Sequence, residues 1–364
     1  MIKRLWLYVT AHIDGFLLGA VCILMLLGLF VLYSATGQDL AKTSNQLLSM
    51  LIALGVMWAV SQISPQNLMR LSVPMYVAGI LLLIAVALFG DVVNGARRWL
   101  HVGVTRVQPA EIMKIAVPLM LAWYFDKHEA ALRLKNYVVA TLLLLVPVAL
   151  IVRQPDLGTA ILIAASGFYV LFLAGLSWRI MLTFLVLGLA SLPVLWSVLR
   201  DYQRQRILTL LDPSTDPLGA GYHTIQSTIA VGSGGVTGKG WLNGTQSHLE
   251  FLPARHTDFV FAVFSEEFGL LGNLVLLVLY MLVIGRGLII ASNASTLFAR
   301  LMAGAVTLTF FTYAFVNMAM VSGILPVVGV PLPLVSYGGT ALVTICLGFG
   351  ILMSIETHKK LVKT

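Results

Sequence analysis

The chain has 364 residues, of which 59% are hydrophobic and only 10% are charged, and its mean hydropathy is +0.94. This composition excludes an ordinary water-soluble domain and places the chain in a lipid bilayer. The net charge of +8 is too thinly spread to indicate nucleic-acid binding. The two cysteines, Cys22 and Cys346, lie in apolar runs and indicate neither a disulfide framework nor a metal site.

Ten apolar runs have about the length of a membrane-spanning helix, so we expect an all-α polytopic membrane protein. Residues 1–364 are expected to form one integral membrane domain, with a large extracytoplasmic loop at 200–257 between the seventh and eighth helices. No small-residue cleavage site follows the first run, which favours a retained helix over a signal peptide. The predicted spans are 15–34, 46–63, 73–90, 110–125, 137–152, 157–175, 178–198, 258–285, 298–322 and 337–355.

The distribution of basic residues predicts the orientation of the chain. If the amino terminus is inside, cytoplasmic segments hold bases such as Lys3, Arg70, Lys135 and Lys359. Since positive charge favours the cytoplasmic side, we expect both termini in the cytoplasm. The bases of the outer loops break this bias and are therefore candidates for function.

Three short motifs at the outer ends of helices carry charge. In NGARRWL, Arg97 and Arg98 fit headgroup anchoring and diphosphate binding equally well. In QPAEIMK, Glu111 and Lys114 are three residues apart on a helix and are expected to pair, either to orient helices or to shape a charged cavity. Asp156 of QPDLGTA occupies a helix N-cap position, which explains it structurally, although it also lies near the same mouth.

The loop 200–257 is the longest polar segment, and a loop of this length is usually functional or disordered. Its apolar residues argue against disorder, so we expect it to fold back over the outer mouth of the bundle. The glycine-rich stretch 232–240 lacks the spacing of a phosphate-binding loop and is expected to be a flexible turn. Candidate substrate-binding bases in this loop are Arg204, Arg206, Lys239, Arg255 and His256.

The loop ends at Asp258, where an apolar run begins that also carries Glu266 and Glu267. If the run is helical from Asp258, Glu266 lies roughly 80° around the helix and can face the same cavity, while Glu267 lies about 180° away and cannot. Capping and local pairing are the structural explanation of these carboxylates, and a site is the functional one. Prolines and glycines in 323–341 break the later apolar stretch, which predicts a further wall of an outer cavity.

The chain resembles the polytopic cell-wall polymerases of shape, elongation, division and sporulation (the SEDS family), and their rod-shape branch more than their division branch. The resemblance covers residues 15–355 and departs at Ala110, where the family has serine. It rests on six motifs in order: NGARRWL, QPAEIMK, QPDLGTA, YQRQRILTLLDPSTDPLGAGYHTIQS, GKGWLNGTQSHLEFLPARHTDFVFA and LPLVSYGGT.

This resemblance implies a peptidoglycan glycosyltransferase of the bacterial inner membrane that joins lipid II into β-1,4 glycan strands and releases undecaprenyl diphosphate. It places the family's essential aspartate on Asp258 and its Glu–Lys pair on Glu111 and Lys114. Implied partners are a class B penicillin-binding protein, which is a transpeptidase, and other membrane proteins of the elongation complex. The active site would face the periplasm.

The residues are compatible with this chemistry. A carboxylate such as Asp258 is a natural general base for a sugar hydroxyl, and a diphosphate leaving group needs only charge stabilisation. Oxygen ligands from Asp258, Glu266 and the donor phosphates would suit Mg²⁺ or Mn²⁺, a cofactor that the sequence does not itself show. The alternatives are a lipid II flippase and a structural scaffold. No inverted repeat supports the flippase, and a scaffold leaves the intramembrane carboxylates unexplained.

Overall fold

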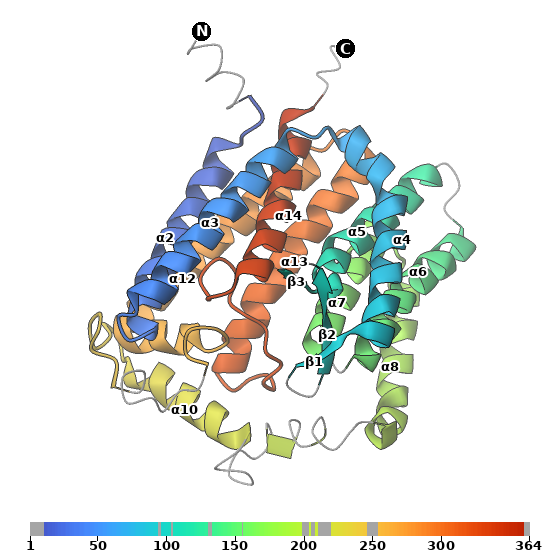
Figure 1. Cartoon of the computed structure of the whole chain (residues 1–364). Helices are drawn as coiled ribbons and strands as arrows, with labels where there is room; N and C mark the ends of the chain where they lie inside the picture. The colour runs from blue at the N-terminus through green and yellow to red at the C-terminus, as the bar shows by residue number, and fades with distance from the viewer. Residues whose placement is uncertain are drawn as a thin grey trace.

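The computed structural model describes residues 11–93, 96–102, 105–129, 133–154, 156–198, 204, 208–209, 220–245 and 254–359. The chain folds into a bundle of long helices with a helical loop region across one end (Figure 1). Its helices are α2 (Gly15–Ala35), α3 (Leu40–Ser61), α4 (Pro65–Phe89), α5 (Pro109–Lys127), α6 (Leu134–Arg153), α7 (Leu157–Leu173), α8 (Trp178–Val198), α10 (Ala220–Ser233), α12 (Val260–Ser292), α13 (Leu297–Val321) and α14 (Gly339–Thr357).

The predicted polytopic helical architecture is confirmed. Each of the ten predicted apolar runs coincides with a helix, although α3 and α4 begin earlier than predicted and α12 extends further, to Ser292. In the part of the chain that the structure describes, seven helices are long and apolar enough to cross a membrane, namely α2, α3, α4, α6, α12, α13 and α14. α7 is a shorter apolar helix, and α5 is less apolar because Glu111, Lys114 and Asp126 lie within it.

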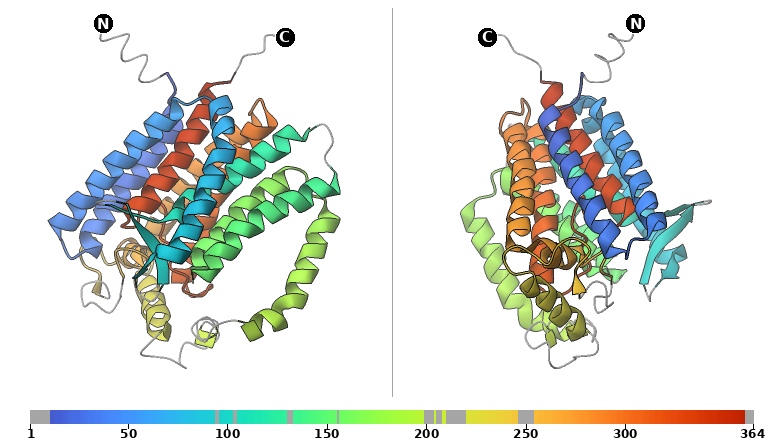
Figure 2. Two further views of the ribbon diagram at one scale, coloured as in Figure 1. Left: turned by 45° about the vertical axis from the view of Figure 1, so that its right-hand side comes forward. Right: turned by 90° about the vertical axis from the view of Figure 1, so that its left-hand side faces the viewer.

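α5 and α13 form the interior of the bundle, and α8 runs along its periphery (Figure 2). α13 contacts α12, α7, α5 and α14, so its residues are buried on most sides. Small residues let helices approach closely, as membrane helices require. A Cβ added at Gly304 would lie 2.3 Å from Leu173, and one added at Gly287 would lie 2.3 Å from Thr307.

The helix ends show which parts of the chain lie at the same end of the bundle. The beginning of α2, the end of α14, the end of α5 and the beginning of α6 lie at one end of the bundle, while α10 lies at the opposite end (Figure 1). This arrangement agrees with the predicted topology, in which both termini share a side and the loop 200–257 lies on the other. The loop does fold back on the bundle where it is described, because α10 packs against α12 and α13.

A small antiparallel sheet between α4 and α5 was not predicted from the sequence. It consists of β1 (Asp91–Val93), β2 (Ala96–Val102) and β3 (Thr105–Val107), with β2 in the middle. Val92 pairs with Arg97, and Leu100 pairs with Val107. Two strands of three residues are too short to give a clear alternating pattern, so this stretch resembled a loop. The sheet places Arg97 and Arg98 on its middle strand, between the end of α4 and the beginning of α5.

Candidate functional site

The site is organised around an irregular segment, residues 322–338, between α13 and α14. Irregular backbone at membrane depth requires partners for its polar groups. Tyr280 of α12 donates a hydrogen bond to the carbonyl of Pro333 at 2.6 Å. Gln46 of α3 donates to the carbonyl of Ser336 at 3.3 Å and accepts from the amide of Gly338 at 3.2 Å. These buried side chains fix a segment that is not helical.

Asp258 lies against this segment, in a turn just before α12. Its backbone carbonyl accepts a hydrogen bond from the side chain of Asn317 at 2.8 Å, and the same amide group donates to the carbonyl of Val330 at 2.7 Å. A Cβ added at Gly329 would lie 3.6 Å from Oδ2 of Asp258, so the carboxylate faces that glycine. Half-buried Asp258 is thus held through its backbone by α13, and its carboxylate faces the irregular segment. We call this region, residues 254–258 together with 328–338, the Asp258 mouth.

The residues before Asp258 are fixed by the end of the irregular segment. The hydroxyl of Ser336 donates to the carbonyl of Thr257 at 2.6 Å, and the amide of Tyr337 donates to the carbonyl of His256 at 2.9 Å. The His256 ring meets the Tyr337 ring edge to face, with centroids 5.8 Å apart. Two chain segments far apart in sequence therefore form one rigid rim next to Asp258.

The surroundings of His256 are electropositive. Burial lowers the pKa of His256 below its ordinary value, and the positive charges of Lys42 and Arg255 lower it further. The imidazole is therefore neutral at neutral pH. The guanidinium of Arg255 extends over the turn after α2, since a Cβ added at Gly37 would lie 3.8 Å from its Nη2. A positive rim of this kind favours an anionic ligand.

Asp156 and Arg98 lie on the other side of the irregular segment. Asp156 caps α7 by accepting from the amide of Thr159 at 3.2 Å, as predicted. Its Oδ2 also accepts from Gln108 at 3.2 Å and lies 3.8 Å from Nε of Arg98. The beginning of α7 contacts the irregular segment closely, because a Cβ added at Gly158 would lie 2.7 Å from the carbonyl oxygen of Val328. Asp156 and Asp258 thus flank the same segment, whereas Arg97 on β2 is exposed.

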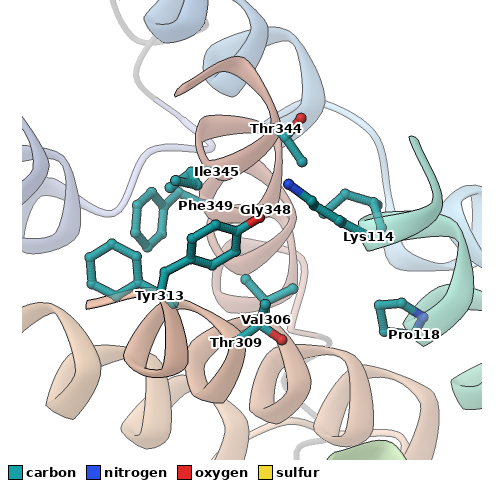
Figure 3. Close-up of a pocket in the computed structure, with 11 residues that line it drawn as sticks. Lys114, Pro118, Val306, Thr309, Tyr313, Thr344, Ile345, Gly348 and Phe349 are labelled. Carbon is teal, nitrogen blue, oxygen red and sulfur yellow. The ribbon is translucent and has the colours of Figure 1, made fainter. Parts of the chain in front are cut away.

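The predicted pair of Glu111 and Lys114 is formed. Nζ of Lys114 donates to Oε1 of Glu111 at 2.6 Å, and both side chains are buried, with 6% and 13% exposed. The ammonium also lies 5.2 Å from the ring centroid of Tyr313. Figure 3 shows the Lys114 amine pointing into a cavity of about 40 Å³ between Tyr313 of α13 and Thr344 of α14. This pair lies in the bundle interior, near the beginning of α5.

The expected common cavity of Asp258 and Glu266 is not what the structure shows. α12 begins at Val260, so Asp258 precedes the helix and helical spacing does not relate the two carboxylates. Glu266 is fully buried, and its Oε1 accepts from Nζ of Lys239 at 2.7 Å and from the amide of Thr245 at 2.9 Å. Glu267 is also buried, and it accepts a hydrogen bond from Ser34 of α2.

This arrangement determines which side chains could hold a metal ion. Within the described ranges, no three His, Cys, Asp or Glu side chains gather closely enough to hold an ion. Glu266 is bonded to Lys239 and Thr245, so the residues present do not fit a cation shared by Asp258 and Glu266.

Arg204 and Arg206 were predicted to bind substrate. Arg204 donates to the backbone carbonyls of Trp196 and Ser197 at 2.9 and 2.8 Å, and so caps the carboxyl end of α8. Arg206 lies outside the described residues.

Gln46, Asn317 and Ser336 were not singled out from the sequence, yet they hold the mouth together. Asn317 offered the clearest signal. It is a polar residue within the apolar run of α13 and lies a few residues before the proline-rich stretch. A buried amide in such a run must find polar partners, and the nearest carbonyls without regular partners lie in that stretch.

Comparisons with known proteins agree with one another over almost the whole chain. A family model for FtsW, RodA and SpoVE, described as cell cycle protein, matches residues 15–361. The chain is 53% identical to Escherichia coli (strain K12) peptidoglycan glycosyltransferase MrdB, over 96% of this chain and 95% of that protein. It is 33% identical to Treponema pallidum peptidoglycan glycosyltransferase RodA, over 96% of this chain and 99% of that protein.

Two solved structures have the same fold. One is a chain of a peptidoglycan synthase complex described as coordinating polymerization and crosslinking, with a TM-score of 0.83 and 34% identity, covering 95% of this chain and 99% of that one. The other is Thermus thermophilus rod shape determining protein RodA, with a TM-score of 0.73 and 30% identity, covering 95% of this chain and 98% of that one.

Proposed function

The chain belongs to the FtsW/RodA/SpoVE (SEDS) family and is a peptidoglycan glycosyltransferase of the rod-shape kind, and on this premise we propose that Asp258 is its general base. The substrate is lipid II, which the enzyme polymerises into β-1,4 glycan strands with release of undecaprenyl diphosphate. The observation that carries the assignment is the placement of Asp258. Its carboxylate faces the irregular segment at a positive mouth, and its backbone is held by Asn317.

The proposed reaction uses this carboxylate to activate the acceptor sugar. Asp258 takes the proton of the acceptor hydroxyl as that oxygen attacks the anomeric carbon of the donor. The new glycosidic C–O bond forms as the bond from that carbon to the diphosphate oxygen breaks. The leaving diphosphate keeps the electron pair and needs positive charge more than it needs a proton.

Arg255 and Arg98 are the proposed partners of the diphosphate. Both lie at the outer mouth on either side of the irregular segment, and a guanidinium forms forked hydrogen bonds with phosphate oxygens. Asp156 orients Arg98 in this arrangement, whereas exposed Arg97 is left to contact headgroups or the sugar phosphate from outside. The buried pair of Glu111 and Lys114 shapes the interior wall below the site.

A divalent cation, Mg²⁺ or Mn²⁺, stays a prediction. With Glu266 engaged by Lys239 and Thr245, such an ion would take oxygen ligands from Asp258 and from the substrate diphosphate. The reaction as proposed is derived from the protein's own residues and does not depend on the ion.

The protein is a multi-pass membrane protein, and its place in the cell follows from the reaction. We propose the bacterial inner membrane, both termini in the cytoplasm and the Asp258 mouth on the periplasmic side. The similar peptidoglycan synthase complex coordinates polymerization with crosslinking. By analogy, we propose a class B penicillin-binding protein as transpeptidase partner, together with other membrane proteins of the elongation complex.

A lipid II flippase is the second candidate, because a charged pair inside a helical bundle also suits a substrate pathway. Purified protein distinguishes the two. In detergent there is no second leaflet, so a flippase has nothing to move, whereas the polymerase converts lipid II into glycan strands. We expect strands from the purified chain with its partner. Absence of product both with and without the partner would contradict the proposal.

A further inference from the structure

α12 is broken near its beginning. Gly269 has φ 63° and ψ −160°, a backbone conformation essentially restricted to glycine, which separates residues 260–268 from the long remainder of the helix. A break leaves helical carbonyl and amide groups without their usual partners. Residues 234–240 supply these partners through four backbone bonds of 2.9–3.0 Å: Lys239 to Glu266, Gly240 to Glu267, Leu270 to Gly235 and Leu271 to Val236.

The two segments fit so closely that glycine is needed on both sides. A Cβ added at Gly238 would lie 2.1 Å from the carbonyl oxygen of Glu267, and one added at Gly269 would lie 2.3 Å from the amide nitrogen of Gly238. Gly238 itself has φ 80°. The glycine-rich stretch that resembled a flexible turn is therefore a fitted insert in the broken helix.

An ion pair between buried Glu266 and partly exposed Lys239 locks this insert. Oε1 of fully buried Glu266 accepts from Nζ of Lys239 at 2.7 Å and from the amide and hydroxyl of Thr245 at 2.9 and 3.0 Å. The ring of Trp241 stacks on Phe30 of α2, with centroids 4.1 Å apart. Residues 234–245, which we call the insert, are thus fastened at the α12 break and on α2.

The insert continues directly from α10, which packs against α12 and α13 beside Asp258. α10 ends at Ser233, one residue before the insert begins. At its other end, the ring of His223 stacks on Phe259, the residue after Asp258, with centroids 5.9 Å apart. α10 also reaches the end of α13, because a Cβ added at Gly323 would lie 3.3 Å from Oγ1 of Thr228. Fixing the insert therefore fixes the helix that packs beside the site.

We propose that Glu266 and Lys239 are positioning residues, which lock the insert into the α12 break and so hold α10 beside Asp258, and that neither contacts lipid II. The inference rests on the proposed role of Asp258 and deepens it. If it holds, the charges of this pair are dispensable as long as the insert stays attached.

A disulfide in place of the ion pair tests this directly. The backbone bond of 3.0 Å between Lys239 and Glu266 brings their Cα atoms within disulfide range. The double variant Lys239→Cys/Glu266→Cys is made in the full chain with Cys22 and Cys346 replaced by serine, and assayed for lipid II polymerisation with the partner present. The reduced form should lose about tenfold in kcat with little change in KM. The reason is that the catalytic geometry is disturbed while the groups that bind substrate remain. The oxidised form should recover to within about twofold of the cysteine-free parent.

Single variants Lys239→Cys and Glu266→Cys, treated with the same oxidant, are the matched controls and should stay slow. An oxidised double variant as slow as the reduced one, or a loss confined to KM, would mean that Lys239 or Glu266 acts on the substrate, and the inference would be wrong. If the double variant does not accumulate, hydrogen exchange of Glu266→Gln decides. Exchange at Lys239, Gly240, Leu270 and Leu271 should be faster than in the parent, and unchanged exchange would refute the inference.

The role of Asp258 can be tested in the same protein independently of the role of the insert. Adding Asp258→Asn to the oxidised double variant should abolish polymerisation. If strands still formed, the proposed base would be wrong, while the recovery on oxidation would still report on the insert.

Discussion

Asn317 holds Asp258 in place from within the bundle: its side-chain amide donates to the Asp258 carbonyl at 2.8 Å. The same nitrogen donates to the carbonyl of Val330 at 2.7 Å, so one buried side chain ties the catalytic turn to the irregular segment. Two carbonyl acceptors leave no choice in the orientation of the amide, because only its NH₂ group can face both. The position of the proposed base, and with it its reactivity, therefore depends on α13.

Replacing Asn317 by leucine should slow polymerisation more than it lowers substrate affinity. Leucine keeps the size but donates no hydrogen bond, which leaves two buried carbonyls unpaired at about 1–3 kcal/mol each. We expect a lower unfolding temperature in detergent, and a kcat reduced by about tenfold or more with a KM near the parent value. Steady-state kinetics on lipid II measure the second effect.

Asn136→Leu is the matched control, since Asn136 is also a buried asparagine but lies at the beginning of α6, away from the mouth. It should lower stability without changing kcat. Equal losses of kcat in both variants would show that Asn317 matters only for folding.

Glu111 and Lys114 should behave as one unit. Removing either partner leaves a lone buried charge, which costs about 3–5 kcal/mol, so Glu111→Ala and Lys114→Ala should each lower the unfolding temperature and the activity. The double variant should be less affected than the sum of the single variants, with a coupling of about 0.5–3 kcal/mol. Denaturation of the parent, the two single variants and the double variant in detergent measures this coupling energy. Strict additivity would show that the 2.6 Å contact carries no coupling energy.

His256 should make stability depend on pH. Burial, and then the charges of Lys42 and Arg255, lower its pKa from 6.5 in the folded protein. As pH falls through the unfolded value, the unfolded state binds the proton first, so stability drops and levels off only below the folded pKa. His256→Gln removes this contribution, and its unfolding temperature should fall less than that of the parent between about pH 7.5 and about pH 5.5. Identical slopes for parent and variant would contradict the assignment.

Labelling of single cysteines tests the orientation in the membrane. Val236, 62% exposed in the insert, and Lys135, at the beginning of α6, lie at opposite ends of the bundle. In a chain without native cysteines, Val236→Cys should react with an impermeant reagent added outside spheroplasts, and Lys135→Cys should react only after lysis. Reaction of both from outside would invert or abolish the proposed topology.

Hydropathy was sufficient to predict the helices, because a span in lipid needs a long apolar run whatever it packs against. Motif resemblance pointed to Asp258, and spacing to the pair of Glu111 and Lys114. The relation of Asp258 to Glu266 was wrong for a physical reason. Residues 260–292 form one apolar run. Their hydropathy therefore shows neither that α12 begins only after Asp258 nor that the helix is broken at Gly269.

The periodicity of the sequence could not predict contacts between segments that are distant along the chain. Gln46 lies in the polar first part of α3 and Asn317 in the apolar run of α13, and only the folded chain shows that both serve the segment 322–338. The insert was also missed, because glycine-rich sequence is compatible with both a free turn and a tightly fitted one. What distinguishes the two is the set of carbonyls and amides released at Gly269, which the sequence does not display.

The most direct test of the account is polymerisation of lipid II by purified Asp258→Asn protein with its partner. Asparagine keeps the shape of the side chain but cannot take the proton, so the rate should fall by about 10²–10⁴ while insertion and partner binding are unchanged. Asp39→Asn is the control, because Asp39 is an exposed aspartate that caps α3 near the same end of the bundle, and it should polymerise at close to the parent rate. Long strands made by Asp258→Asn at close to the parent rate would contradict the assignment of Asp258 as the base.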